Sequence, residues 1–252
     1  MLFRSGLNIS GPFNIQFLAV NNDIKVIECN LRCSRSFPFS SKVTGNNFVD
    51  IATKAMLGIA KKEAYRTLDL DYVGVKAPQF SFSRLKGADP VLGVEMASTG
   101  EVACFGDDIH EAFFKAMLST GFVVPKENIF VSIGKTEDKA DFLPAARKLV
   151  TLGFKLHASH GTADFFKENE VPVVEHEDFA AIIHRGKTDW VINVPRSYSH
   201  EEATRGYGIR RLAIDNNIPL TIDVKVAKLM VDTLERYSID DLPIEPWGSY
   251  VD

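Results

Sequence analysis

The sequence of 252 residues has few cysteines and no long apolar run, and each absence excludes a class of protein. Cys29, Cys33 and Cys104 are too few, and odd in number, for a disulfide scaffold, which favours a reducing compartment. No apolar run approaches the roughly 18 residues of a membrane span, and the N-terminus lacks a signal-peptide pattern. We expect no membrane partner and a cytoplasmic location, with a mitochondrion as the alternative if a targeting peptide preceded Met1.

A basic block is also absent. The chain has 29 Lys and Arg against 33 Asp and Glu, a formal net charge of −4, so nucleic acid is not an expected partner. Hydrophobic residues make up 45% of the chain and charged residues 25%, which is the composition of a folded protein with a real core.

Two short β-prone runs, 13–20 and 24–30, flank the turn-favouring residues 21–23 and predict a hairpin. If Val20 pairs with Ile24, Gln16 faces Glu28 and both lie with Asn14 and Asn30 on one side of the ribbon, because side chains alternate. The other side is mainly apolar and is expected on a core.

Helices are predicted at 48–58 and 108–118 and a strand at 72–78, with long connections at 31–47 and 79–100. So few elements over some 120 residues indicate part of a domain with a truncated N-terminus. A hairpin without its domain partners would expose its apolar face, and association through that face would give a homo-oligomer.

After Pro125 apolar strands alternate with amphipathic helices, which predicts an α/β fold with a doubly wound parallel sheet. Ligand sites in such a sheet lie at the carboxyl ends of the strands. The predicted strands are 128–133, 154–158, 171–174, 190–194 and 220–222, and the predicted helices are 139–152, 162–169, 178–184, 207–216 and 224–237.

The polar hairpin face carries the first candidate site. The oxygens of Gln16, Glu28 and Asn30 suit Mg²⁺ held together with nucleotide phosphates. Arg32 and Arg35, shortly after, could stabilise charge on a transferred phosphoryl group. The alternative is a polar hairpin end with solvated arginines.

The run 159–162, Ser-His-Gly-Thr, joins a predicted strand to a predicted helix and is the second candidate site. Two hydroxyls, a glycine and the amides of a helix N-terminus suit an anion. The alternative is N-capping by Thr162. His157 and His160 form an H-x-x-H pair, but a strand-to-loop segment does not put both rings on one face, so we expect no metal site there. Cys29 and Cys33 have the spacing of a metal-binding pair, but no second Cys or His pair follows, so we expect no zinc site there either.

Four runs, 11–16 (GPFNIQ), 26–39 (VIECNLRCSRSFPF), 41–45 (SKVTG) and 95–102 (EMASTGEV), closely resemble the large subunit of carbamoyl phosphate synthetase. The resemblance implies the C-terminal part of that family's second ATP-grasp unit, an α+β fold, at 1–122. It implies a methylglyoxal-synthase-like allosteric domain at 123–252.

In this family the second ATP-grasp unit phosphorylates carbamate with ATP and Mg²⁺, or Mn²⁺, for pyrimidine and arginine synthesis. By position, the resemblance makes Gln16, Glu28 and Asn30 the metal ligands and Arg32 and Arg35 catalytic. Implied partners are the rest of the synthetase and a glutamine amidotransferase subunit or domain. Because most of an ATP-grasp core would precede residue 1, the chain alone is expected to be catalytically incomplete.

For the allosteric domain the resemblance implies a small-molecule nucleotide or another phosphorylated effector, such as UMP, UTP, IMP or phosphoribosyl pyrophosphate, with N-acetylglutamate in urea-cycle members. The run 203–213 resembles the eukaryotic pyrimidine type, and its arginines are either phosphate donors or solvated helix residues. The implied effector-binding residues are Lys139, Ser159, Thr162, Asn193, Arg205 and Arg210.

Two other functions stay open. The chain could be a stand-alone effector-binding regulatory module, or a lyase like methylglyoxal synthase. The Gly-Asp segment and following histidine of that lyase are replaced here by 193–196 (NVPR), so we expect no lyase activity.

Overall fold

The computed structural model describes residues 6–60, 70–93, 95–183, 188–196 and 205–251, although the side chain of Arg205 is not described. The chain divides into two compact units, Met1–Gly74 with Ile244–Asp252, and Val75–Pro243. These units follow packing, whereas the boundary predicted between residues 122 and 123 concerns family modules and stays a prediction. No helix in the described part of the chain is both long and apolar enough to cross a bilayer.

In the first unit, β1 (Asn14–Val20) and β2 (Asp23–Asn30) form the predicted hairpin. Asn21 and Asn22 make its turn with φ of 50° and 65°, a left-handed conformation that asparagine tolerates better than most residues. The helices α2 (Ser36–Thr44) and α3 (Phe48–Met56) follow. The C-terminal 3₁₀ turn Trp247–Ser249 returns to this unit, where the Trp247 indole donates to the carbonyl of Lys42 at 3.0 Å.

The register of the hairpin is as predicted only at its open end. Gln16 pairs with Glu28, but Val20 pairs with Asp23 instead of Ile24. The two-residue turn leaves β2 one residue longer than β1, and a bulge beside Gln16 and Phe17 absorbs that residue.

The expectation that the apolar hairpin face lies on a core is wrong for the described chain. Phe17 is 52% exposed and Ile27 is 62% exposed. The hairpin is a two-stranded sheet on its own, and these exposed fractions show that the rest of the described chain leaves these apolar side chains largely uncovered.

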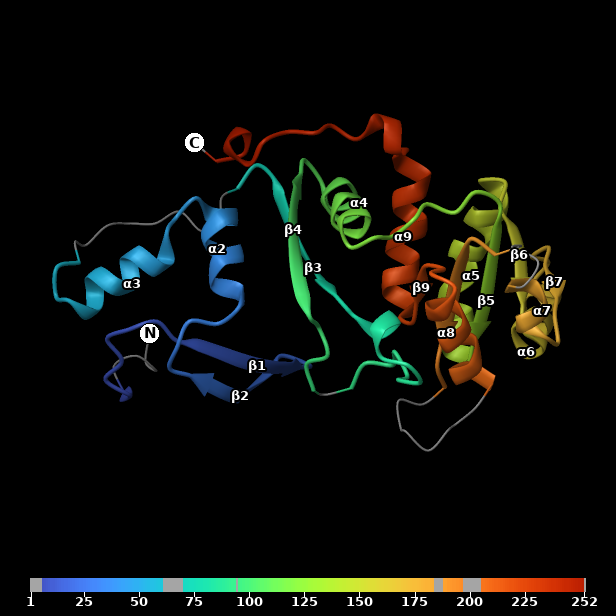
Figure 1. The fold of residues 1–252 in the computed structure, drawn as a ribbon, viewed down its shortest axis with the longest axis horizontal. Coiled ribbons are helices and arrows are strands. Elements are labelled where there is room, and N and C mark those ends of the chain that lie inside the picture. The colour runs from blue at the N-terminus through green and yellow to red at the C-terminus, as the bar shows by residue number, and fades with distance from the viewer. Residues whose placement is uncertain (1–5, 61–69, 94, 184–187, 197–204, 252) are drawn as a thin grey trace. The chain divides into compact units, whose positions relative to one another are not determined.

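The second unit contains the predicted parallel sheet, with strand order β7-β6-β5-β8-β9. Figure 1 labels β5, β6, β7 and β9 of this sheet. Its strands are β5 (Asn128–Ile133), β6 (Lys155–Ala158), β7 (Val174–Glu175), β8 (Trp190–Val194) and β9 (Leu220–Thr221). The helices between and after them are α5 (Thr136–Thr151), α6 (His160–Glu168), α7 (Phe179–Ile183), α8 (Arg205–Asp215) and α9 (Val224–Arg236). The prediction of a doubly wound α/β sheet is confirmed.

Alternation along the strands divides the core between the two sheet faces. Ile129, Val131 and Ile192 lie in one cluster with residues of α5, α6 and α9. Phe130 and Val191, one position along, lie in a second cluster with residues of α7 and α8. Both faces of the sheet are therefore covered, which is why its strands read as continuous apolar runs.

Before this sheet, β3 (Val73–Gln79) and β4 (Gly100–Gly106) form a two-stranded sheet, and α4 (Ile109–Ser119) joins the core beside α9. Strand β4 and helix α2 are missing from the sequence-based prediction. Helix α2 has serines and Pro38 where a regular apolar stripe would signal a helix, although proline is tolerated in the first turn.

Candidate functional site

Three polar residues meet at the carboxyl ends of β5, β6 and β8. Ser132 pairs with Asn193 across β5 and β8, while Ser159 directly follows β6, whose Ala158 pairs with Val131. Because the strands are parallel, their carboxyl ends lie at one sheet edge, where doubly wound folds bind ligands.

Hydrogen bonds join these residues. The Ser159 hydroxyl donates to the Ser132 hydroxyl at 3.0 Å, and the Asn193 amide donates to the Ser132 carbonyl at 3.3 Å. Sequence analysis identified Ser159 and Asn193 but missed Ser132. A signal was available, because Ser132 is the polar residue near the carboxyl end of an otherwise apolar run.

Thr162 is 1% exposed and bonds to the backbone of Ile133 at the end of β5. Its hydroxyl accepts from the Ile133 amide at 3.0 Å and faces the Ile133 carbonyl at 3.3 Å. The alternative of N-capping by Thr162 is wrong, because α6 begins at His160 and its N-cap residue is Ser159. Thr162 instead satisfies backbone groups that a longer β6 would have paired.

Lys139 brings a positive charge to the same edge. Helix α5 begins at Thr136, three residues before the predicted start, so Lys139 lies near its N-terminal end. The ammonium donates to the Gly161 carbonyl at 2.6 Å. A Cβ atom at Gly161 would lie 3.7 Å from this nitrogen, so the ammonium lies close over the glycine.

Arg210 is buried, so the alternative of a solvated helix arginine is wrong for it. Its Nη1 donates to the Asn193 side-chain oxygen at 2.8 Å, while Nε and Nη2 donate to the two oxygens of Asp89 at 2.7 and 2.6 Å. Asp89 had no sequence signal, because it lies 121 residues before Arg210. Arg205 begins α8, and its side chain lies outside the described residues.

The other predicted site lies on the hairpin. Glu28 and Gln16 are register partners, and the Asn30 amide donates to Glu28 Oε1 at 2.9 Å. This bond turns the Asn30 amide nitrogen toward Glu28, and the remaining carboxylate and amide oxygens are hard donors that fit Mg²⁺. Arg32 is exposed and donates to the Cys33 carbonyl at 3.3 Å, while Arg35 is the N-cap residue of α2.

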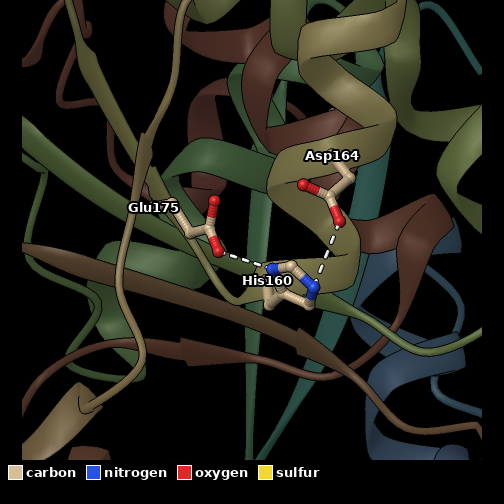
Figure 2. A group of neighbouring side chains, drawn as sticks. All are labelled: His160, Asp164 and Glu175. Atoms are coloured by element: carbon tan, nitrogen blue, oxygen red, sulfur yellow. Dashed lines mark hydrogen bonds and ion pairs between the residues drawn. The ribbon is translucent and has the colours of Figure 1, made fainter.

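His160, Asp164 and Glu175 form a cluster that sequence analysis did not find (Figure 2). His160 Nδ1 lies 2.5 Å from Glu175 Oε1, and Nε2 lies 3.4 Å from Asp164 Oδ2. The contact with Glu175, followed by the charge of Asp164, raises the pKa of His160 above 6.5. Lys167 lies 2.5 Å from the other Glu175 oxygen and is the larger cause of the lowered pKa of that carboxyl.

This geometry suits an imidazolium better than a metal ion. The two ring nitrogens face different carboxylates, whereas a single ion would need both carboxylates near one nitrogen (Figure 2). His157, the other member of the H-x-x-H pair, contacts His176 at 2.8 Å and Asn128 at 3.0 Å instead. The two histidines therefore have separate partners.

Comparison with known protein families assigns both parts of the chain. Residues 3–64 match the carbamoyl-phosphate synthase L chain, ATP binding domain, and residues 141–222 match the MGS-like domain. The chain therefore contains part of a carbamoyl-phosphate synthase ATP-binding domain followed by an MGS-like domain. The resemblance seen in the sequence is thereby confirmed.

Relatives in this family are much longer. The chain is 51% identical over 255 residues to the multifunctional protein pyr1-3 of Dictyostelium discoideum, covering 95% of this chain and 11% of that protein. It is 46% identical over 268 residues to the multifunctional protein CAD of Squalus acanthias, covering 98% of this chain and 12% of that protein. It is 46% identical over 249 residues to the human carbamoyl-phosphate synthase [ammonia], mitochondrial, covering 90% of this chain and 16% of that protein.

Among solved structures, a methylglyoxal synthase from Elizabethkingia anophelis NUHP1 aligns with a TM-score of 0.35 and 18% identity, covering 43% of this chain and 79% of that one. The domain assignments therefore rest on the sequence matches, which place part of an ATP-binding domain before an MGS-like domain.

Proposed function

We propose that the MGS-like domain binds a phosphorylated small molecule at the carboxyl edge of β5, β6 and β8, and that this effector regulates carbamoyl phosphate synthesis. The observation that carries the proposal is the convergence of predicted effector residues from four separate segments. Lys139, Ser159, Thr162 and Asn193 surround the same edge, and Arg210 contacts Asn193 directly.

The chemistry of this edge suits an anion. Lys139 and Arg210 provide two cations, and Ser132 and Ser159 provide hydroxyls. The first turn of α6 adds backbone amides, which favour negative charge at a helix N-terminus. Such donors bind phosphate oxygens without any need for a metal ion.

The test is thermal unfolding of the chain with UMP, UTP, IMP, phosphoribosyl pyrophosphate and N-acetylglutamate. A ligand that binds the native state raises the melting temperature by mass action. We expect a shift with a phosphorylated compound that Ser159→Ala reduces. The control Thr151→Ala also removes a hydroxyl, one bonded to the Arg147 carbonyl near the C-terminal end of α5, and should keep the shift. Equal shifts in both variants, or none with the wild type, would contradict the proposal.

For the hairpin we propose a role in the phosphorylation of carbamate with MgATP by the whole enzyme. Glu28, Asn30 and Gln16 would hold the divalent cation, whose chemistry is to neutralise phosphate charge. Arg32 and Arg35 would bind oxygens of the transferred phosphoryl group. The match of residues 3–64 to an ATP-binding domain supports this role.

Manganese binding followed by electron paramagnetic resonance tests the hairpin. Glu28→Gln should weaken Mn²⁺ binding in the presence of ATP. Asp23→Asn removes the same charge from the turn end of β2, where Asp23 contacts Lys25 at 3.4 Å, and should leave binding unchanged. If the two variants bind Mn²⁺ equally well, Glu28 is not a ligand.

The relatives named multifunctional proteins support the proposal that the chain works with the rest of a synthetase and a glutamine amidotransferase. A cytoplasmic location and self-association through the exposed hairpin face are also proposals. The human relative is named as mitochondrial, so similarity to these relatives does not fix the compartment.

A further inference from the structure

Helix α8 holds a segment that lies far from it in the sequence. We call residues 82–89, in the connection between β3 and β4, the clamped segment. The Tyr207 hydroxyl donates to the Gly87 carbonyl at 2.9 Å. Arg211 donates to the carbonyls of Phe82, Leu85 and Ala88, the last two at 3.0 Å. Arg210 adds the ion pair with Asp89, so three residues within two turns of α8 fix this segment.

The Arg210 contact differs from the others because it reaches the candidate effector site. All three guanidinium nitrogens are engaged, two by the carboxylate of Asp89 and one by Asn193. Asn193 in turn donates to the carbonyl of Ser132, whose hydroxyl accepts from Ser159. A series of hydrogen-bonded residues therefore links the proposed phosphate donors to the clamped segment.

We propose that Asp89 occupies Arg210 in place of the effector, and that an anionic group of the effector displaces Asp89 and releases the clamped segment. This inference rests on the proposed function of the same site. Asp89 is thus an internal competitor that couples effector binding to the connection between β3 and β4.

Burial explains why an effector anion can replace Asp89 beside Arg210. The Arg210 side chain is 4% exposed, and a buried guanidinium needs an anionic partner at all times. The Asp89 side chain is 25% exposed, so its carboxylate can return to water when another anion takes the guanidinium. An anion that entered while Asp89 stayed would place two negative charges beside one arginine, which costs Coulomb energy.

Geometry explains why an anion such as a phosphate group can replace Asp89. Asp89 binds the Nε and Nη2 edge of Arg210 with both oxygens, in the forked arrangement that a phosphate group can also satisfy. A neutral ligand could not replace the carboxylate without leaving the buried charge unpaired. The displacement of Asp89 would therefore select for negatively charged effectors.

The experiment compares Asp89→Asn with Asp215→Asn. Both substitutions remove one carboxylate that is ion-paired with an arginine of α8, but Asp215 pairs with Arg211 at 2.6 Å and does not touch Arg210. Binding of UMP, UTP, IMP and phosphoribosyl pyrophosphate is measured by calorimetry. Removing the competitor should tighten binding about tenfold in Asp89→Asn. Asp215→Asn should bind like the wild type.

Hydrogen exchange supplies a second measurement that needs no variant. In the wild type, a bound ligand should slow amide exchange at 159–163 and speed it at 82–89. The displacement of Asp89 would be refuted if amide exchange slows at 159–163 but stays unchanged at 82–89. Equal ligand affinity in Asp89→Asn and Asp215→Asn would also refute it. Both results would leave the proposed function intact. Failure of the wild type to bind any of the four compounds would overturn both.

Discussion

Replacing Thr162 tests its structural role at the sheet edge. Its hydroxyl accepts from the Ile133 amide at 3.0 Å, in a buried place where no water can substitute. Thr162→Val keeps the shape of the side chain but leaves that amide without an acceptor. An unsatisfied buried donor costs about 1 to 3 kcal/mol, and here the Ser159 hydroxyl loses a neighbour as well, so we expect about 2 to 3 kcal/mol.

Thr162→Ser is the matched control. It keeps the hydroxyl and removes one buried methyl group, which costs about 1 kcal/mol. The free energy of unfolding is measured by urea denaturation, followed by the fluorescence of buried Trp190 in a Trp247→Phe background. If Thr162→Val is as stable as the wild type, or if Thr162→Ser loses as much as Thr162→Val, the hydroxyl does not complete the sheet edge as argued.

Three further predictions concern the same unit. Gly134→Ala places a Cβ atom 2.6 Å from the Arg196 amide nitrogen and should cost about 1 to 3 kcal/mol in urea unfolding, because a backbone must shift, whereas Gly208→Ala has open space and should not destabilise the chain. The raised pKa of His160 means that its ion pairs stabilise the fold below about pH 6.5 and lose this effect as pH rises through the folded-state pKa. His160→Asn should therefore lower the melting temperature more at about pH 6 than at about pH 9, and an equal loss at both would refute the ion pairing. Arg211→Met should speed hydrogen exchange at 82–89, because three carbonyls lose a buried donor; unchanged exchange would show that Arg211 does not hold the segment.

Local sequence patterns were sufficient to predict most helices and strands of the second unit. Strands β5 and β8 have the predicted bounds, because an apolar run buried on both faces ends where polar residues begin. Boundaries elsewhere differ by a few residues, as at α5, where the first turn is polar and carries no apolar signal. Helix α2 and strand β4 were missed because neither has a clear periodic pattern.

The hairpin shows how far local rules extend. Pairing of Gln16 with Glu28 follows from strand alternation, but the bulge depends on which turn the asparagines adopt. Exposure of Phe17 could not follow from its own run of sequence, because an apolar face has the same pattern whether or not another layer covers it.

The sequence by itself determined the resemblance to two known domains, the alternating α/β pattern and the polar residues at the ends of strands, since each depends on residues close together in the chain. Only the tertiary structure decided which of these residues meet and what holds them. From the sequence, Thr162 could be an anion ligand or a helix cap, and the structure shows that it bonds to the backbone of Ile133. Arg210 could be a phosphate donor or a solvated arginine, and the structure shows that it is buried against Asp89. The physical reason is that burial and ion pairing depend on contacts between segments as much as 121 residues apart, and single-sequence patterns do not record such contacts.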